Sequence, residues 1–466
     1  MFLAGAIFLV VIFVLISVIA SRNIKSSEDY SVAGRSATIS GVSGIIMGAL
    51  VGGASTVGTV QMAYEWGLSA WWFTLGAGIG CLILGVWFAK PLRDSGLVTI
   101  PAFLKVHYGK SLSQVSMLSS SVGTFISIIA QFLAGVALFR GVFPLGLFQA
   151  SLIFGILVLG FIYLGGLKSY SQIGKAKIAT LYLTLFICSL FAVLGGSTPV
   201  GLLQDLPFNP YFNIFGRGIS SDVGALISMI VGVFCTQIYI QGIYAASDSR
   251  TARKGVILAS FLMPPLGLMG IYIGLSMKYA GVQINTSQAL PYFIIHTFPA
   301  PVAGILWAGI LITVIGAAAG LSLGISTNIV MDLFFHSPLA IDEASEFKIL
   351  IVSRITVAFI VVSAAYVGTI LNGSMILHWS FLSMGLRGVG TFFPLIVAIL
   401  WPGSLPGNWA LISVISGISV LFAVPFSGNE TLHPLFTGLI TSGAFVIAGS
   451  IHSKQNRNNL NRNSRR

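Results

Sequence analysis

Long apolar runs separated by short polar segments cover almost the whole chain. Each run is close to the ~20 residues that a helix needs to cross ~30 Å of hydrocarbon. Polar residues within the runs are few and mostly small, which predicts helices that face lipid or one another on most sides. We expect thirteen spans, at 1–20, 38–64, 68–89, 112–139, 144–164, 176–196, 221–245, 255–279, 300–333, 349–368, 378–401, 407–426 and 432–452.

The composition indicates the same class of protein. Of the 466 residues, 56% are hydrophobic and only 8% are charged, whereas soluble globular chains carry about 25% charged residues. So few charges cannot cover a water-exposed surface, which excludes a cytosolic enzyme, a disordered chain and a secreted disulfide scaffold. The three cysteines lie in apolar runs without metal or redox spacing. We therefore predict an all-α polytopic membrane protein.

Basic residues predict how the chain is oriented in the membrane. The run 1–20 is followed, not preceded, by Arg22 and Lys25, the reverse of a cleaved signal peptide, so we expect a first span with the N-terminus outside. Of the 24 Lys and Arg residues, 20 then fall in inside segments, three fall outside and Arg387 falls within a span. This distribution places the C-terminus in the cytoplasm.

The net charge of +12 is thus explained by orientation in a plasma (inner) membrane, and we expect the lipid bilayer and no nucleic acid as a partner. The polar, basic tail 453–466 is predicted to be disordered and cytoplasmic. Neither a GxxxxGK[ST] nor an HExxH motif occurs, so neither an ATP-driven pump nor an enzyme is expected.

The 38–64 span contains an unusual number of small residues. Six glycines lie between positions 41 and 58, and Gly52-Gly53 is followed by the hydroxyls of Ser55 and Thr56. Each glycine destabilises a helix by about 1 kcal/mol relative to alanine, so we predict a helix break here. Transporters use such breaks to bind ions and solutes. Close helix packing through small residues is the alternative interpretation.

Six short motifs, in the same order along the chain, resemble the sodium:solute symporter family. They are Asp29-Tyr30 with Gly34-Arg35, Tyr64 with Gly67, Thr99 and Pro101 with Tyr108-Gly109, Gly165-Gly166 with Lys168, Gln237 and Gln241 with Ala252-Arg253, and Ser326-Thr327 with Asp332. The thirteen predicted spans agree with the bacterial sodium/proline-like branch.

The resemblance implies a five-plus-five inverted-repeat transporter fold that works by alternating access. Within a single transporter domain, 1–466, the first repeat would cover 38–196 and the second 221–402. The spans at 1–20 and within 407–452 would be additions to this core. The resemblance also implies sodium as the coupling ion.

The sodium site that the resemblance implies lacks ligands in this chain. The family uses backbone carbonyls of the second span, which correspond to Gly48 and Val51, and two adjacent hydroxyls of the ninth span. Those two positions are Gly316 and Ala317, and neither has a side-chain oxygen, although a third family position is Thr313. Hard cations need several oxygen ligands. We therefore expect a degraded sodium site, with no cofactor and no other metal.

Lys177 is a candidate to replace the ion. The family commonly has an aspartate six residues after its Gly-Gly turn, where this chain has Gly174, followed by Lys175 and Lys177. An ammonium group that reaches the ion cavity supplies the charge of a bound cation. Alternatively, both lysines are ordinary inside residues at the start of a helix.

Arg387 lies nine residues, ~13 Å, into the 378–401 span. An arginine at the middle of a membrane helix costs about 2.5–3.5 kcal/mol, and no acidic residue lies in mid-span to pair with it. Three interpretations remain open. The guanidinium binds backbone carbonyls of broken helices, it binds the carboxylate of a substrate, or it substitutes for a cation.

Several further polar residues are candidates to contact a solute, although each is equally well explained as a packing contact. They are Ser55, Thr56, Thr74, Thr236 and Gln237. The sugar-transporting branch of the family has a carboxylate at position 74 and polar and aromatic side chains at 229–233. This chain has Thr74 and an apolar stretch there, which disfavours a sugar.

We therefore expect a secondary transporter for a small organic solute, with a carboxylate among the candidate solutes. The coupling cation is Na⁺ or H⁺, unless the protein is a uniporter. A membrane-embedded solute sensor of the same fold is the alternative. The solute and the oligomeric state are not specified by the sequence.

Overall fold

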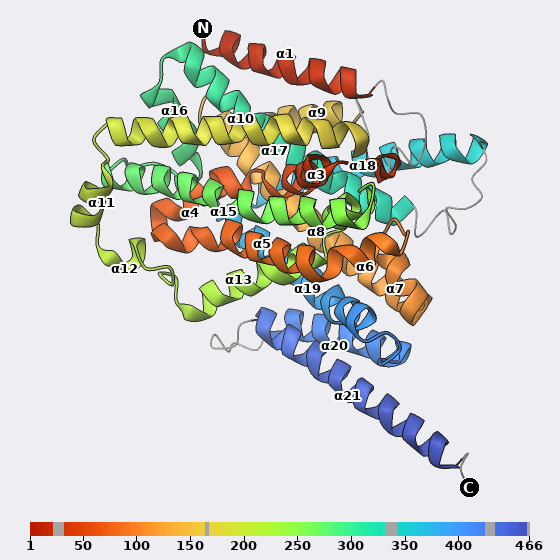
Figure 1. Ribbon diagram of the computed structural model, residues 1–466. Coiled ribbons are helices and arrows are strands. Elements are labelled where there is room, and N and C mark those ends of the chain that lie inside the picture. Colours follow the sequence, from red (N-terminus) through yellow and green to blue (C-terminus); the bar gives the residue numbers. More distant parts are fainter. Residues whose placement is uncertain (22–31, 164–166, 331–342, 425–433, 464–466) are drawn as a thin grey trace.

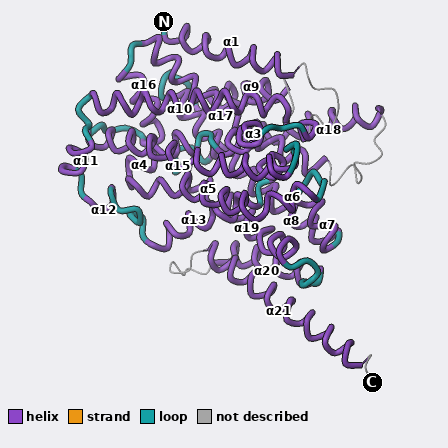
Figure 2. The backbone as a smooth tube through the Cα atoms, in the orientation of Figure 1, coloured by secondary structure: helices purple, strands orange, loops and turns teal. Residues whose placement is uncertain are grey.

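The computed structural model describes residues 1–21, 32–163, 167–330, 343–424 and 434–463, and this part of the chain is helical, without strands (Figure 2). Short 3₁₀- or π-helical segments lie at Ala33–Arg35, Ala54–Gly58, Gly67–Trp71, Leu84–Phe88 and Thr286–Gln288. The α-helices are α1 (Phe2–Ser21), α3 (Ile39–Leu50), α4 (Thr59–Trp66), α5 (Trp72–Ile83), α6 (Ala89–Asp94), α7 (Ile100–Tyr108), α8 (Lys110–Arg140), α9 (Leu147–Tyr163), α10 (Leu167–Leu194), α11 (Pro199–Asp205), α12 (Phe208–Tyr211), α13 (Ile219–Phe234), α14 (Gln237–Tyr244), α15 (Ser249–Tyr279), α16 (Ala289–Thr297), α17 (Ala300–Ile329), α18 (Glu343–Ile370), α19 (Ile376–Leu400), α20 (Gly407–Ala423) and α21 (Pro434–Asn463).

The all-α membrane fold is confirmed, whereas the number of spans stays a prediction. Among the described residues, eight helices are long and apolar enough to cross a membrane, or up to nine if the bent pair α13–α14 is one span. Four shorter apolar helices accompany them, at Phe2–Ile16, Ile39–Leu50, Leu147–Ile162 and Gly407–Ala423. Every predicted span coincides with one of the helices or with a broken helix.

Two helix boundaries differ from those predicted. Helix α10 begins at Leu167, nine residues before the predicted span, so Lys177 lies inside a helix and not near its start. Helix α21 continues to Asn463, so the prediction of disorder is wrong for the tail up to that residue. Neither glycine nor proline occurs between 453 and 463, and nothing in this segment stops a helix that has already formed.

The predicted break in the 38–64 span is present. Helix α3 begins after Thr38, whose hydroxyl accepts a hydrogen bond from the Gly41 amide at 3.2 Å. It ends at Val51, which has an extended backbone (φ −85°, ψ 102°). The chain then passes through the π-helical segment Ala54–Gly58 into α4.

A second break separates α13 from α14, which are bent by 43° at Cys235 and Thr236. Each proposed repeat therefore opens with a broken helix, as an inverted-repeat transporter requires. Backbone hydrogen bonds join the same end of both broken helices, because Ala37 donates to Ala245 at 2.9 Å and accepts from Ser247 at 3.2 Å.

The two broken helices lie inside the bundle. Helix α3 packs against α10, α15 and α17, while α13 packs against α5 and α19. Helix α8 contacts both α17 and α19 and so lies between the two groups. Helix α1 covers one edge, next to α10 and α17, and α20 and α21 pack against α19 at the opposite edge (Figure 1).

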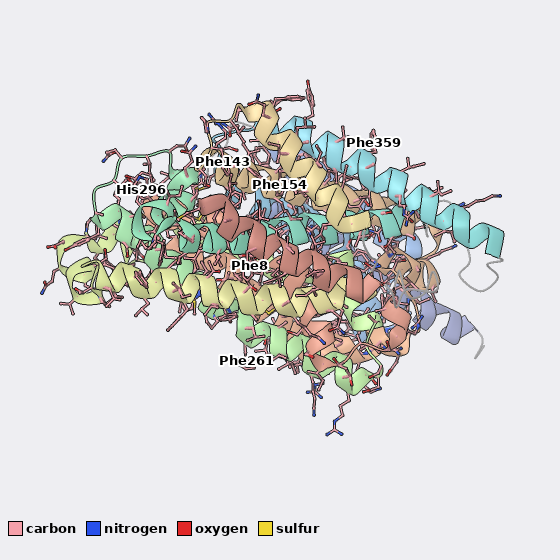
Figure 3. The ribbon with its side chains drawn as sticks, turned by 90° about the horizontal axis from the view of Figure 1, so that it is seen from above. Phe8, Phe143, Phe154, Phe261, His296 and Phe359 are labelled. Atoms are coloured by element: carbon pink, nitrogen blue, oxygen red, sulfur yellow. The ribbon has the colours of Figure 1, made fainter. Side chains whose placement is uncertain are left out.

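Large apolar side chains cover the outer surface of the bundle. Phe8, Phe261 and Phe359, labelled in Figure 3, are 60%, 68% and 73% exposed. Such side chains are stable on a surface that faces hydrocarbon, where burial from water is supplied by lipid. The exposed surface thus supports the membrane environment that the composition predicts.

Candidate functional site

Lys177 is buried between helices, with 2% of its surface exposed. Its Nζ atom donates a hydrogen bond to the carbonyl oxygen of Gly48 at 2.5 Å. Gly48 lies in the last turn of α3, just before the break at Val51. Among the described residues, no carboxylate forms an ion pair with Lys177. The ammonium group therefore lies inside the bundle, next to the first break.

The Lys177 side chain also fills the space beside Gly316 on α17. A Cβ atom at position 316 would lie 3.2 Å from both Cδ and Nζ of Lys177. Tyr170, two turns earlier on α10, donates its hydroxyl to the carbonyl of Gly316 at 3.0 Å. Helix α10 thus contacts α3 and α17 at two positions, 48 and 316, that the family resemblance assigns to sodium.

The residues at two other expected sodium positions, Ala317 and Thr313, make contacts within the protein. Ala317 is fully buried, and its Cβ lies 2.4 Å from the place of a Cβ at Gly52, which only glycine tolerates. The hydroxyl of Thr313 donates to the Gly309 carbonyl of its own helix at 2.7 Å. The structure therefore brings Gly48, Gly316 and Lys177 together, and it leaves Thr313 bonded within α17.

The side chains of Ser55 and Thr56 form hydrogen bonds to the backbone of the first break. The Gly52 amide donates to Ser55 Oγ at 2.9 Å, and the hydroxyls of Ser55 and Thr56 donate to the Gly52 carbonyl at 3.1 and 2.7 Å. These contacts satisfy backbone groups that the break removes from the helical ladder. Both candidate solute ligands are thus bonded to the broken backbone.

Gln131 on α8 completes the first break and was missed from the sequence. Its Oε1 atom accepts a hydrogen bond from the Gly53 amide at 2.6 Å. A Cβ at Gly53 would lie 2.3 Å from the Cβ of Ala134, so α8 approaches the break closely. A glutamine in the apolar run 112–139 was the available signal.

Arg387 is fully buried beside the second break. Its Nη1 donates to the hydroxyl of Thr236 at 2.5 Å. Its Nη2 donates to the hydroxyls of Ser127 and Ser383, both at 2.6 Å. Its Nε donates to the Ser383 carbonyl at 3.2 Å. Every one of these partners is a neutral oxygen.

A close helix contact and further polar groups surround Arg387 at the second break. A Cβ at Gly123 on α8 would lie 2.6 Å from Cγ of Arg387, so the glycine admits the arginine stem. Ser120 donates to the Cys235 carbonyl at 3.1 Å, and Thr236 donates to Gly232 at 2.6 Å. Thr236 therefore lies in the second break and contacts Arg387.

Two other candidate solute ligands are bonded elsewhere. The side-chain amide of Gln237 makes two hydrogen bonds, both at 3.0 Å. Its Oε1 atom accepts from the backbone amide of Ile100, and its Nε2 atom donates to the backbone carbonyl of Val98. Thr74 lies against Gly267 of α15 and donates to the Trp71 carbonyl at 3.4 Å. The structure does not bring these two together with Arg387 and Thr236.

Parts of the motifs that suggested the family lie outside the described residues. These are Asp29-Tyr30, Gly165-Gly166 and Asp332. The rest can be placed. Gln241, for example, donates from Nε2 to the hydroxyl of Thr327 at 3.1 Å and joins α14 to α17.

Solved structures with the same arrangement of helices are transporters. The chain matches a Na⁺-coupled sialic acid symporter in a substrate-bound outward-open state with a TM-score of 0.80, at 14% identity over 97% of both chains. It also matches a nucleobase-cation-symport-1 family transporter with bromovinylhydantoin bound, with a TM-score of 0.59, at 14% identity over 92% of this chain and 95% of the other. These likenesses show the fold.

Two curated relatives are similar in sequence. An uncharacterised symporter of Bacillus subtilis (strain 168) is 23% identical over 279 residues, which are 56% of this chain and only 52% of the relative. A sodium/glucose cotransporter of Vibrio parahaemolyticus is 22% identical over 464 residues, 89% of this chain and 84% of the relative. Family and neighbours are transporters and not enzymes.

The decisive comparison is with a sequence model of the sodium:solute symporter family, which matches residues 30–417. The matched range contains both broken helices, Lys177 and Arg387. This multi-pass membrane protein belongs to the sodium:solute symporter family.

Proposed function

We propose that this protein carries a small organic solute by alternating access around its two broken helices, and that it does so without sodium at the family's usual site. The observation that carries the proposal is the 2.5 Å hydrogen bond from Lys177 Nζ to the Gly48 carbonyl. In this proposal the ammonium group replaces the ion.

The chemistry of the site supports this replacement. A sodium ion needs several oxygen ligands, yet positions 316 and 317 carry none on their side chains. An ammonium group needs only acceptors for its hydrogen bonds, and it carries the same charge. Lys177 therefore supplies one positive charge at the junction of α3, α10 and α17 without a complete ligand shell.

The replacement changes what drives transport. A tethered charge is not released into the cytoplasm, so this site cannot couple solute movement to a sodium gradient. If Lys177 releases its proton during the cycle, the protein is a proton-coupled carrier; if it stays charged, the protein is a uniporter. Both modes are independent of sodium.

The distribution of basic residues supports an orientation for the carrier. We place it in the plasma (inner) membrane with the N-terminus outside and the C-terminus in the cytoplasm, as the positive-inside rule requires. The backbone contact of Ala37 with Ala245 and Ser247 then lies at the cytoplasmic end.

Uptake into proteoliposomes tests the proposal. Solutes would first be found by thermal stabilisation of the purified protein with a library of acids, amino acids, sugars and vitamins, because a ligand of the native state raises its melting temperature. Uptake of each hit would then be measured with sodium and with choline in its place. We expect equal rates in both.

Lys177→Met is expected to abolish or strongly slow this uptake. Lys175→Met is the matched control, because Lys175 lies on the same helix and its Nζ donates to Gln172 in an exposed pair at 3.3 Å. Uptake by the wild-type protein that requires sodium contradicts the proposal. Saturable binding of a solute without any uptake indicates a sensor in place of a carrier.

A further inference from the structure

Arg387 is connected to both helix breaks through α8. Its guanidinium contacts Thr236 in the second break and Ser127 on α8. One turn along α8, Gln131 donates to the Ser127 carbonyl at 3.5 Å and accepts from Gly53 in the first break. Transporters built from broken helices bind their solutes between the breaks, near the middle of the membrane. Arg387 therefore lies at the place where a solute is expected.

Among the residues that the structure describes, no carboxylate forms an ion pair with Arg387. An arginine stays protonated inside proteins, and the guanidinium of Arg387 donates to three hydroxyls and one carbonyl, which are all neutral. The acidic side chains that the structure describes lie at helix ends, at Glu65, Asp94, Asp205, Asp222 and Asp248. A buried cation without an anionic partner is costly, and a carboxylate is the partner that fits the guanidinium fork.

We propose that Arg387 binds the carboxylate of the transported solute, an inference that rests on the proposed transport function. The two carboxylate oxygens take the places of the Thr236 and Ser127 hydroxyls at Nη1 and Nη2. This exchange replaces bonds from the guanidinium to neutral oxygens by a bidentate pair with an anion, which also compensates its charge. The hydroxyl of Thr236 keeps its hydrogen bond to the Gly232 carbonyl, and that of Ser127 keeps its bond to Ser383.

This assignment predicts a monocarboxylate or amino acid as the solute, since the side chains around the guanidinium carry no second charge. Ser127, Ser383, Thr236 and Tyr239 surround it, and Gly123 lies against its stem. A sugar would leave the charge of Arg387 uncompensated.

Thermal unfolding of the purified full-length protein with paired probes tests the assignment. The pairs are acetate and acetamide, propionate and propionamide, benzoate and benzamide, and proline and prolinamide. We expect at least one carboxylate, and not its amide, to raise the melting temperature. Arg387→Lys keeps the positive charge but loses the two-pronged donor geometry of the guanidinium. We expect the apparent affinity of this variant for that carboxylate to fall roughly tenfold to a hundredfold.

Arg387→Gln removes the charge and is expected to abolish stabilisation by the carboxylate. If this variant does not fold, Arg387→Lys and Ser127→Ala decide the matter. Ser127→Ala removes a neutral competitor for Nη2, so the carboxylate should bind at least as tightly as to the wild-type protein. A purely structural arginine predicts a lower melting temperature in these variants with no change in affinity.

Three results would overturn the assignment: a carboxylate and its amide that stabilise equally, a panel in which no carboxylate stabilises the wild-type protein, or an unchanged affinity in Arg387→Lys. Chloride or sulfate that stabilises as well as any carboxylate would also count against an organic anion. A failure of the proposed function gives a different experimental result. A sodium requirement refutes the role of Lys177 and leaves the difference between carboxylate and amide intact.

Discussion

The Nζ atom of Lys177 lies 3.2 Å from the point where a Cβ atom at Gly316 would stand. Any side chain at position 316 therefore competes with the lysine for the same space. The family resemblance assigns a hydroxyl to this position, and this chain has glycine. The glycine at 316, which supplies no oxygen, thus leaves the space that the ammonium group of residue 177 fills.

This competition predicts an energetic coupling between the two positions. Gly316→Ser should lower the stability of the wild-type protein by about 1–3 kcal/mol, because the new side chain overpacks against Lys177. In a Lys177→Ala background the same change should cost much less. Thermal unfolding of the four proteins gives the coupling energy as a double-mutant cycle.

Gly324→Ala on the same helix is the matched control for that cycle. A Cβ at Gly324 would meet Ile238 at an ordinary 3.4 Å and would not approach Lys177. Its effect should be the same with and without the lysine. Additive effects of Gly316→Ser and Lys177→Ala would show that the two positions do not compete.

A sodium site should be recoverable in this chain by three substitutions. In Lys177→Ala with Gly316→Ser and Ala317→Ser, the ammonium group is removed and hydroxyls stand at the two positions that the family resemblance assigns to sodium. We expect sodium, and not choline, to raise the melting temperature of this variant. At a sodium concentration ten times Kd the gain is about 1.4 kcal/mol.

Lys177→Ala alone serves as the control for the recovered site, since it opens the space without supplying oxygens. It should show no response to sodium beyond that of ionic strength. A wild-type protein that sodium stabilises as strongly as the triple variant would show that the ion binds without displacing Lys177.

The sequence predicted those features that depend on local residue types. The first break follows from Gly52-Gly53 and the neighbouring hydroxyls, because glycine weakens a helix wherever it stands. Lys177 was recognised as a candidate from its place shortly after the Gly165-Gly166 turn, where the family resemblance puts the edge of the ion cavity. Its burial was not predictable, since the start of α10 at Leu167 depends on packing against α3 and α17.

Features that depend on contacts between distant segments were not predicted. The second break, at Cys235 and Thr236, contains no glycine pair from which it could have been predicted. Gln237 was a candidate for binding solute, yet its amide bonds to residues 98 and 100, more than 130 positions away. Such partners are determined by how helices meet, and a polar residue in an apolar run does not indicate which neighbour it will contact.

Gln131 should be required for the geometry of the first break. Gln131→Met keeps the length of the side chain but leaves the Gly53 amide without its acceptor, which costs about 1–3 kcal/mol for a buried group. We expect a lower melting temperature and slower uptake. Gln131→Glu keeps an acceptor at this position and should retain more of both. If the methionine variant is as stable and active as the wild-type protein, another group must satisfy Gly53.

Asp248 connects stability to pH at the end of α15. It is the N-cap residue of this helix, and its carboxylate accepts from the Thr251 hydroxyl at 2.7 Å and the Thr251 amide at 2.9 Å. These hydrogen bonds, together with one from Ser247, lower the pKa of Asp248 to about 2. An aspartate in an unfolded chain has a pKa of about 3.9.

Because the pKa of Asp248 is lower in the folded state, its stabilising effect is complete above about pH 4 and is lost as the pH falls towards about 2. Asp248→Ala should therefore melt at a lower temperature than the wild-type protein at pH 7, and the difference should shrink through this window. Asp248→Asn keeps a capping oxygen without a titrating group. Its melting temperature should stay close to that of the wild-type protein at pH 7. A gap between Asp248→Ala and wild type that is unchanged at pH 2 would mean that the charge of Asp248 plays no part in capping α15.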